Sequence, residues 1–185
     1  MDEYIDLKNG DFVIGERVEL YREIILNNPE ILMAAQNFGN LSGAEKIDLA
    51  RMILNKSAIK CGTPTGTIVQ DDAPEGPHIL KESQGGGYQQ GAARFLFRSD
   101  IKNFEKLNSF LRTLAHEDAH RIDYYNENYG MIGTQLMKFV IKNYLDNEQI
   151  SDALYRKFAT EQSYYYLGGT TGAALEYMIR KYQNT

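Results

Sequence analysis

Residues 114–123 read LAHEDAHRID and contain the pattern His-Glu-x-x-His. In an α-helix, residues i and i+4 lie one turn apart on the same face. His116 and His120 can therefore direct two imidazoles toward one metal ion, while Glu117 lies where a carboxylate can reach a water on that metal. The chain has three histidines, and two of them fall in this motif. The pattern predicts a Zn²⁺ site of the peptidase type, with His116 and His120 as metal ligands and Glu117 as the catalytic base.

The residues on either side of the motif predict that it lies on a long helix, followed by further helices. The motif helix is expected over 104–126, because its apolar residues recur at helical spacing. Two more helices are expected over 131–145 and 151–167. The second of these should end at Gly168-Gly169, because glycine is the usual residue just past a helix end. A last helix is then expected to begin at Thr170 or Thr171.

The first third of the chain also reads as helical. Apolar residues recur at helical spacing over 15–27, and Pro29 can open a second helix that stops near Gly39. The run Ser42-Gly-Ala-Glu45 is a capping box and predicts the start of a third helix. Residues 1–60 are therefore expected to form a helical N-terminal subdomain.

The middle of the chain has a different character, because three of the four prolines and a triple glycine lie between residues 61 and 91. This composition indicates loops and turns, with a short strand possible over 65–70. Residues 92–98, AARFLFR, are rich in aromatics and read as a strand. The predicted fold class is therefore α+β and mostly helical. It comprises residues 1–60 packed on a catalytic domain of residues 61–185, or one single compact domain.

Two histidines leave a tetrahedral zinc ion short of one protein ligand, since the fourth position is kept for water. Glu161 is the preferred candidate, because it lies on a later apolar helix and far enough along the chain for it to turn back. Glu148 is the rival, although its surroundings read as a turn and helix start, where acids favour the helix dipole. Glu127 follows the motif too closely, and Glu176 falls on the final helix.

Two aspartates flank the histidines. Asp123 lies three residues past His120 on nearly the same face, where a carboxylate can accept the second N–H of a ligand histidine. The alternative is that Asp123 pairs with Arg121 or Lys142 on a solvated face. Asp118 is expected to point away from the ligands as a surface acid.

Charge and composition exclude several classes of protein. The net charge is -5 and no basic stripe is visible, so nucleic-acid binding is not expected. No apolar run is long enough to span a bilayer, so no membrane partner is expected. The lone Cys61 excludes an internal disulfide and a cysteine-based zinc site. The acidic N-terminal residues lack the features of a Sec signal peptide.

The runs His116–Tyr125 and Phe158–Tyr165 resemble the gluzincin zinc metallopeptidases. The chain is most similar to the catalytic domains of the anthrax lethal factor type and to related metallopeptidase domains of bacterial toxins and effectors. The resemblance covers residues 92–167 and does not extend to the helical first third. One departure is that the later helix carries a single glutamate, whereas the lethal factor pattern has two, four residues apart. The resemblance implies a zincin-like fold with a small sheet and an active-site helix.

A peptidase of this kind needs an oxyanion donor and a surface for its substrate. Tyr165 and Tyr164 are candidate donors, because they lie about one turn or less beyond Glu161. In zincins, a strand before the metal helix can be the sheet edge that pairs with an extended substrate. The strand over 92–98, with Arg94, Phe95 and Leu96, is therefore the expected substrate-binding edge.

The function expected from these residues and from the resemblance is a zinc-dependent endopeptidase acting on a protein or peptide substrate. The resemblance further implies a bacterial effector or toxin, with an inhibitor or immunity protein as a possible partner. Such a protein would be secreted without a signal peptide or delivered into a target cell, and would otherwise be cytoplasmic. The alternatives are a housekeeping or maturation peptidase, and a zincin-fold binding domain without turnover.

Overall fold

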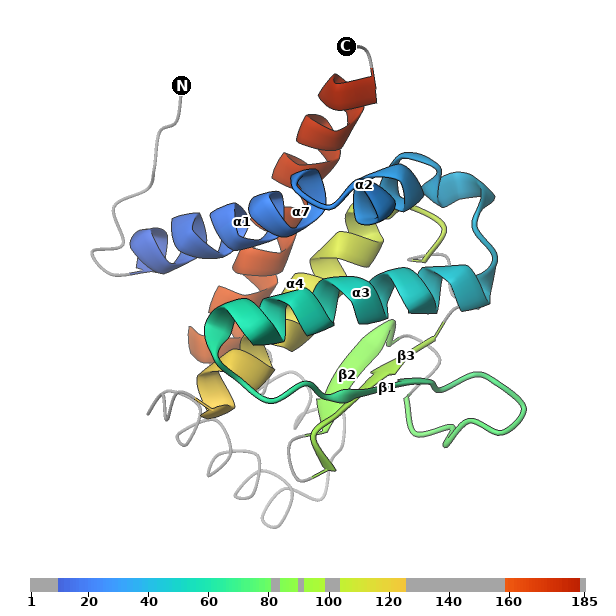
Figure 1. The fold of residues 1–185 in the computed structure, drawn as a ribbon. Coiled ribbons are helices and arrows are strands. Elements are labelled where there is room, and N and C mark those ends of the chain that lie inside the picture. Colours follow the sequence, from blue (N-terminus) through green and yellow to red (C-terminus); the bar gives the residue numbers. More distant parts are fainter. Residues whose placement is uncertain (1–9, 81–83, 90–91, 99–103, 126–158, 184–185) are drawn as a thin grey trace.

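The fold was taken from a computed structural model of the chain, whose described residues form five α-helices and a small three-stranded sheet (Figure 1). The residues that the structure describes are 10–80, 84–89, 92–98, 104–125 and 159–183. Over these ranges the chain is α+β and mostly helical, as the sequence predicts.

Three helices and a short 3₁₀ turn form the N-terminal part. They are α1 (Gly10–Leu26), α2 (Pro29–Gln36), η1 (Phe38–Asn40) and α3 (Gly43–Cys61). Helix α2 begins at a proline, whose fixed φ suits the first helical position and whose missing N–H is not needed there. The predicted helices of this segment are therefore present.

Helix α3 begins and ends where its sequence indicates. The Ser42 hydroxyl accepts a hydrogen bond from the Glu45 backbone N–H, and the Ser42 N–H donates to the Glu45 carboxylate at 2.7 Å. This reciprocal pair is the predicted capping box. At the other end, Gly62 adopts a left-handed φ of 64°, a conformation that glycine reaches without steric cost.

The sheet consists of β1 (Thr67–Gln70), β2 (Gly86–Gln89) and β3 (Arg94–Phe97), in the order β1-β3-β2. Strand β3 pairs with β1 in parallel and with β2 in antiparallel orientation. It is therefore the central strand. The prediction that residues 92–98 offer a free edge to a substrate is wrong, because both sides of β3 are already hydrogen-bonded.

The motif helix α4 (Leu107–Tyr125) packs along α7 (Ala159–Gln183), and α7 crosses behind α1 in Figure 1. The expected helix over 131–145 lies outside the described residues. The predicted break at Gly168-Gly169 is wrong, because α7 continues through both glycines.

The continuity of α7 has a steric explanation. A Cβ added at Gly168 would lie 2.7 Å from the carbonyl oxygen of Arg112, and one at Gly172 would lie 2.7 Å from that of Asn108. These glycines therefore let α7 approach the backbone of α4 closely. The packing of the two helices offsets the helix-propensity cost of glycine, so the residues mark a contact surface instead of a helix end.

One hydrophobic cluster joins the N-terminal helices to the remainder of the described chain. It takes buried residues from α1, α2, α3, the sheet, α4 and α7; examples are Ile24, Ile53, Phe95, Phe110 and Leu175. Residues 1–60 and 61–185 thus share a core where the structure describes them. Among the described residues, no helix combines the length and apolar character that a membrane crossing needs.

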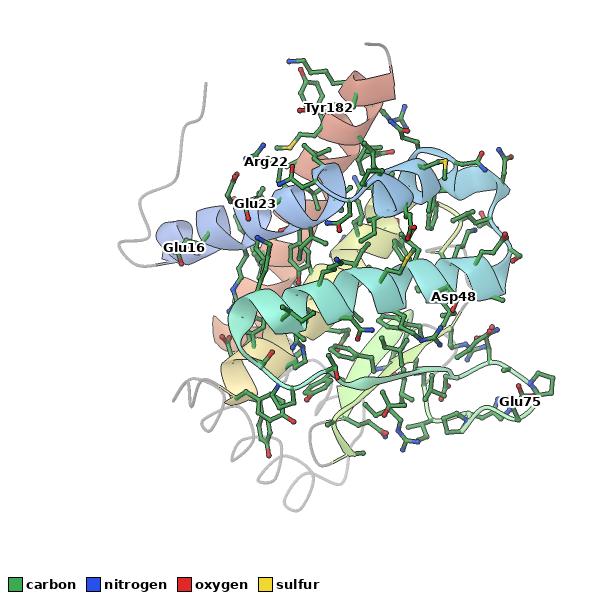
Figure 2. All side chains as sticks on the ribbon, in the orientation of Figure 1. Glu16, Arg22, Glu23, Asp48, Glu75 and Tyr182 are labelled. Carbon is green, nitrogen blue, oxygen red and sulfur yellow. The ribbon has the colours of Figure 1, made fainter. Side chains whose placement is uncertain are left out.

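Several charged side chains of α1 and α3, such as Arg22, Glu23 and Asp48, lie on the outer surface (Figure 2). Arg22 pairs with Glu19 on α1, and Lys60 of α3 pairs with Glu23 of α1. Exposed pairs of this kind contribute little to stability, because water screens them. The apolar core, and not these pairs, therefore holds the helices together.

Candidate metal centre

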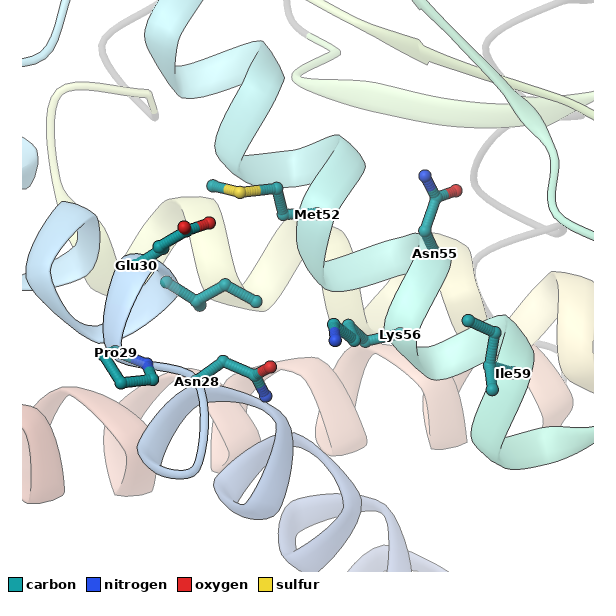
Figure 3. Close-up of a pocket in the computed structure, with 8 residues that line it drawn as sticks. Asn28, Pro29, Glu30, Met52, Asn55, Lys56 and Ile59 are labelled. Carbon is teal, nitrogen blue, oxygen red and sulfur yellow. The ribbon is translucent and has the colours of Figure 1, made fainter.

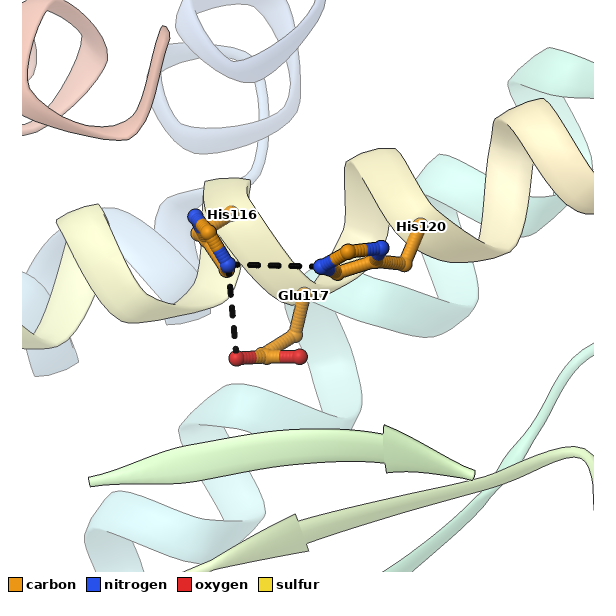
Figure 4. Close-up of side chains that lie close together, drawn as sticks. All are labelled: His116, Glu117 and His120. Carbon is orange, nitrogen blue, oxygen red and sulfur yellow. Dashed lines mark hydrogen bonds and ion pairs between the residues drawn. The ribbon is translucent and has the colours of Figure 1, made fainter. Parts of the chain in front are cut away.

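The three motif residues lie together on α4 and are largely buried. His116, Glu117 and His120 are 9%, 8% and 7% exposed. One ligand atom from each lies within 4.8 Å of the others, a grouping that can hold a metal ion. Figure 4 shows the imidazoles approaching one another across one helical turn, with the Glu117 carboxylate beside them.

The distance between the imidazoles fits a tetrahedral metal ion. The Nε2 atoms of His116 and His120 are 3.3 Å apart. Two nitrogens bound to zinc at about 2.0–2.1 Å and at the tetrahedral angle would be roughly 3.3–3.4 Å apart. The Glu117 Oε1 lies 3.9 Å from the His116 Nε2, close enough for its carboxylate to reach a group bound between the rings. The donor set and spacing therefore suit zinc.

Two tyrosines of α7 form a wall against these rings. The Tyr165 ring centroid is 4.6 Å from that of His116, and the Tyr164 ring centroid is 4.5 Å from that of His120. Tyr164 is 6% exposed and Tyr165 is 37% exposed. The structure therefore brings both predicted tyrosines to the histidines. A catalytic role for either tyrosine depends on where its hydroxyl points.

The carboxylate of Asp123 has partners other than the predicted ones. Its Oδ2 accepts a hydrogen bond from the Tyr164 hydroxyl at 2.6 Å, and its Oδ1 lies 3.3 Å from a guanidinium nitrogen of Arg17 on α1. Among the described contacts, Asp123 thus reaches the two motif histidines through Tyr164 and not by a direct bond. Sequence reasoning missed Arg17, because nothing local links position 17 to position 123.

The opposite face of α4 carries a buried ion pair. Asp118 and Arg121 are both fully buried, and the Arg121 Nε donates to the Asp118 Oδ1 at 2.7 Å. The prediction that Asp118 is a surface acid is wrong. A buried carboxylate is tolerated only when it is paired and hydrogen-bonded, and the pairing is supplied here by a residue three positions further along the same helix.

Residues from earlier in the chain make further hydrogen bonds with this ion pair. Tyr21 of α1 donates its hydroxyl to the Asp118 Oδ2 at 2.6 Å, and the Ser57 hydroxyl of α3 donates to the same oxygen. Arg121 also donates to the Thr63 hydroxyl and, at 3.2 Å, to the Pro64 carbonyl. We call Asp118, Arg121, Tyr21, Ser57 and Thr63 the rear cluster.

The rear cluster shifts the proton affinity of its phenol. Burial, and then the negative charge of Asp118, raise the pKa of Tyr21 well above the ordinary tyrosine value. The phenol therefore stays protonated and keeps donating to Asp118 at neutral pH.

The predicted substrate-binding residues lie within the sheet. Phe95 and Leu96 are 0% and 1% exposed, and the Arg94 Nε donates to the Gln89 side chain at 3.0 Å. Phe95 also lies 4.8 Å from Tyr88, centroid to centroid. These residues thus belong to the sheet that lies next to α4. Because β3 is paired on both sides, it offers no open edge that would support their predicted contact with substrate.

The candidates for the third ligand differ in what the structure describes. The backbone of Glu161 belongs to α7, whereas its side chain lies outside the described part. Glu148 lies outside the described residues entirely. The choice between them stays a prediction.

A separate groove lies between the start of α2 and α3 (Figure 3). Its lining includes Pro29, Glu30, Met52, Lys56 and Ile59. None of the predicted site residues whose side chains the structure describes lines it. The groove is therefore distinct from the candidate metal centre.

No protein-family model matches the chain, and neither a curated protein nor a solved structure matches it. Any functional assignment must therefore come from the residues themselves.

Proposed function

We propose that the protein is a zinc-dependent peptidase that hydrolyses peptide bonds of a protein or peptide substrate. The observation that carries this proposal is the 3.3 Å separation of the His116 and His120 Nε2 atoms, with the Glu117 carboxylate beside them. An i, i+4 pair on a solvated helix face would have no reason to converge on one point. Here the convergent rings are largely buried and in a geometry that suits a tetrahedral ion.

The register of α7 against α4 supports Glu161 as the third ligand. Gly172 approaches Asn108, Gly168 approaches Arg112, and Tyr165 approaches His116. The helices therefore run antiparallel, and each turn toward the start of α7 moves one turn toward the end of α4. Glu161 precedes Tyr165 by four residues, which brings its backbone one turn further, to the level of His120.

Each residue of the site then has a chemical task. Zinc, when bound by His116, His120 and Glu161, would supply Lewis acidity and a water of lowered pKa. Glu117 is suited to accept the proton of the attacking water and to pass it to the leaving amine, because its carboxylate lies beside both rings. Tyr165 is the better-placed oxyanion donor, since its ring adjoins His116 and its side chain is partly exposed.

An extended substrate would have to pair with a strand other than β3. Strand β2 is hydrogen-bonded to β3 on one side, and it packs next to α4. We therefore propose β2, with Gly86 and Gly87, as the edge that receives the peptide backbone. A role as a bacterial effector or toxin rests on the resemblance to lethal factor-type domains.

The test combines metal analysis with cleavage. Purified wild type should contain about one zinc per chain, His120→Ala should lose it, and Glu117→Gln should keep it. Glu117→Gln should lower turnover on a protein substrate by about 10²–10⁴-fold, the usual contribution of a general base. Glu105→Gln is the matched control, because Glu105 is an exposed carboxylate just before α4.

The substrate for this assay is found by mapping new N-termini in lysates treated with wild type or with Glu117→Gln. Host proteins cleaved by wild type alone would support the effector role, and cleavage confined to bacterial proteins would favour a housekeeping peptidase. Zinc bound without cleavage by either variant would contradict the peptidase and indicate a binding domain. Wild type without zinc, even after zinc is supplied, would overturn the proposal.

A further inference from the structure

We infer that Tyr164 is a positioning residue of the metal centre, held by Asp123 and Arg17, and that it is not the oxyanion donor. The inference rests on the proposed function for its metal. It assigns the chain Arg17–Asp123–Tyr164 to the support of the histidine pair and makes α1 part of the site.

The ring of Tyr164 contacts both candidate ligands. Its centroid lies 4.5 Å from that of His120 at an interplanar angle of 70°, and 6.0 Å from that of His116 at 87°. Both are edge-to-face arrangements, which aromatic rings favour because positive edges meet negative faces. A ring in this place restricts the rotation of the two imidazoles, so it can keep their Nε2 atoms turned toward one another.

The hydroxyl of Tyr164 is committed elsewhere. A phenol has one proton to donate, and this one is donated to the Asp123 Oδ2 at 2.6 Å. The same proton cannot be given to an oxyanion unless the bond to the carboxylate breaks. The hydroxyl is thus used to fix the ring, whereas a catalytic donor needs its proton available for the substrate.

Arg17 completes the support from a third helix. Its guanidinium lies 3.3 Å from the Asp123 Oδ1, and the two side chains are only 14% and 15% exposed. The positive charge of Arg17 balances the negative charge of Asp123 at a place where water stabilises that charge only weakly. One chain of contacts therefore joins α1, α4 and α7 at the end of the site nearest His120.

Zinc affinity tests this assignment directly. Tyr164→Phe keeps the ring and removes its hydrogen bond, while Asp123→Asn removes the charge that Arg17 and Tyr164 share. Each should weaken zinc binding about 10–100-fold, as loss of an outer partner of a ligand histidine does. The dissociation constant is measured by competition with a chromophoric chelator. Tyr166→Phe, two residues further along α7 and 55% exposed, is the matched control and should leave it unchanged.

Two further readouts separate positioning from general stability. The visible absorption spectrum of the cobalt-substituted protein should change in Tyr164→Phe and Asp123→Asn, because it reports ligand geometry. The double variant should bind zinc no more weakly than the weaker single variant, since both changes break one chain of contacts. Thermal unfolding of the metal-free variants shows whether each is folded.

Three results would overturn the inference. If Tyr164→Phe binds zinc like wild type and its turnover falls 100-fold or more, Tyr164 is the oxyanion donor. If its affinity, spectrum and turnover are all unchanged while Glu117→Gln is inactive, the inference fails and the proposed peptidase stands. If wild type itself binds no zinc, both proposals fall.

Discussion

The two faces of α4 carry neighbouring residues, in and just after the motif, that have different roles. On the front face, His116, Glu117 and His120 are 7–9% exposed and converge on a point that suits an ion. On the rear face, Asp118 and Arg121 are fully buried and pair with each other and with the rest of the rear cluster. The comparison teaches that Asp118, an intervening position of the motif, is not a spacer here. Together with Arg121 it holds the helix from behind, while the neighbouring Ala119 packs with Tyr164 and Leu167 of α7.

The largest effect on stability is expected from breaking the rear face. Asp118→Ala leaves the Arg121 guanidinium buried without its counter-charge, and should lower the free energy of unfolding by about 3–5 kcal/mol. His120→Ala on the front face should cost less in metal-free buffer, because it leaves no buried charge behind. Urea unfolding followed by circular dichroism measures both, and equal losses would contradict the division into two faces.

A double variant shows whether the rear pair acts as a unit. Asp118→Leu with Arg121→Met removes both charges together, so no unpaired ion is left. It should recover most of the stability that Asp118→Ala loses. If the double variant loses as much stability as its two single variants together, the two residues contribute independently.

A smaller effect, with a defined pH dependence, is expected at Tyr21. Tyr21→Phe removes a donor to Asp118 and should lower the free energy of unfolding by about 1.5–3 kcal/mol at pH 7. Because the pKa of Tyr21 is raised in the folded state, the unfolded chain loses this proton first as the pH rises. The contribution of Tyr21 is therefore complete below about pH 10, the ordinary tyrosine pKa, and is lost above it.

Urea unfolding of wild type and Tyr21→Phe between pH 7 and pH 11 measures this. The two stabilities should converge above pH 10. A difference that stays constant with pH would mean that the Tyr21 phenol ionises as readily in the folded protein as in the unfolded chain.

Close packing of α7 against the front face of α4 is expected to contribute about 1–3 kcal/mol to the free energy of unfolding. Gly168→Ala places a Cβ 2.7 Å from the Arg112 carbonyl oxygen and 3.4 Å from the His116 Cβ, so α7 must move away from α4. Gly169→Ala is the control, because its Cβ meets nothing within 4 Å and alanine favours the helix. The unfolding temperature should fall for Gly168→Ala and not for Gly169→Ala. A fall for both variants would indicate that α7 bends at the glycine pair.

The smallest effect is expected at Cys61, which lies near the rear cluster. Burial, and then the negative charge of Asp118, raise the pKa of its thiol, so little thiolate is present at pH 8. Alkylation at pH 8 should be several-fold slower in the folded protein than in urea. Asp118→Asn should increase the folded rate, and an unchanged rate in a folded variant would mean that burial alone sets this thiol pKa.

Much of the fold and part of the site could be predicted because their causes are local. The start of α3 depends on Ser42 and Glu45, three residues apart, and the imidazole pair depends on the four-residue spacing of one helix. The predictions that failed depended on a distant partner. Gly168 looks like a helix end until α4 lies against it, and β3 looks like an edge until β2 pairs with its second side.

The sequence by itself determined that two imidazoles and a carboxylate share a helix turn, because helical geometry places i and i+4 on one face. Only the tertiary structure decided what surrounds that turn. The partners of Asp118 come from 61 and 97 residues earlier in the chain, and the Asp123 partner Arg17 comes from 106 residues earlier. No local pattern encodes such contacts, because they form only when the shared core brings α1, α3, α4 and α7 together.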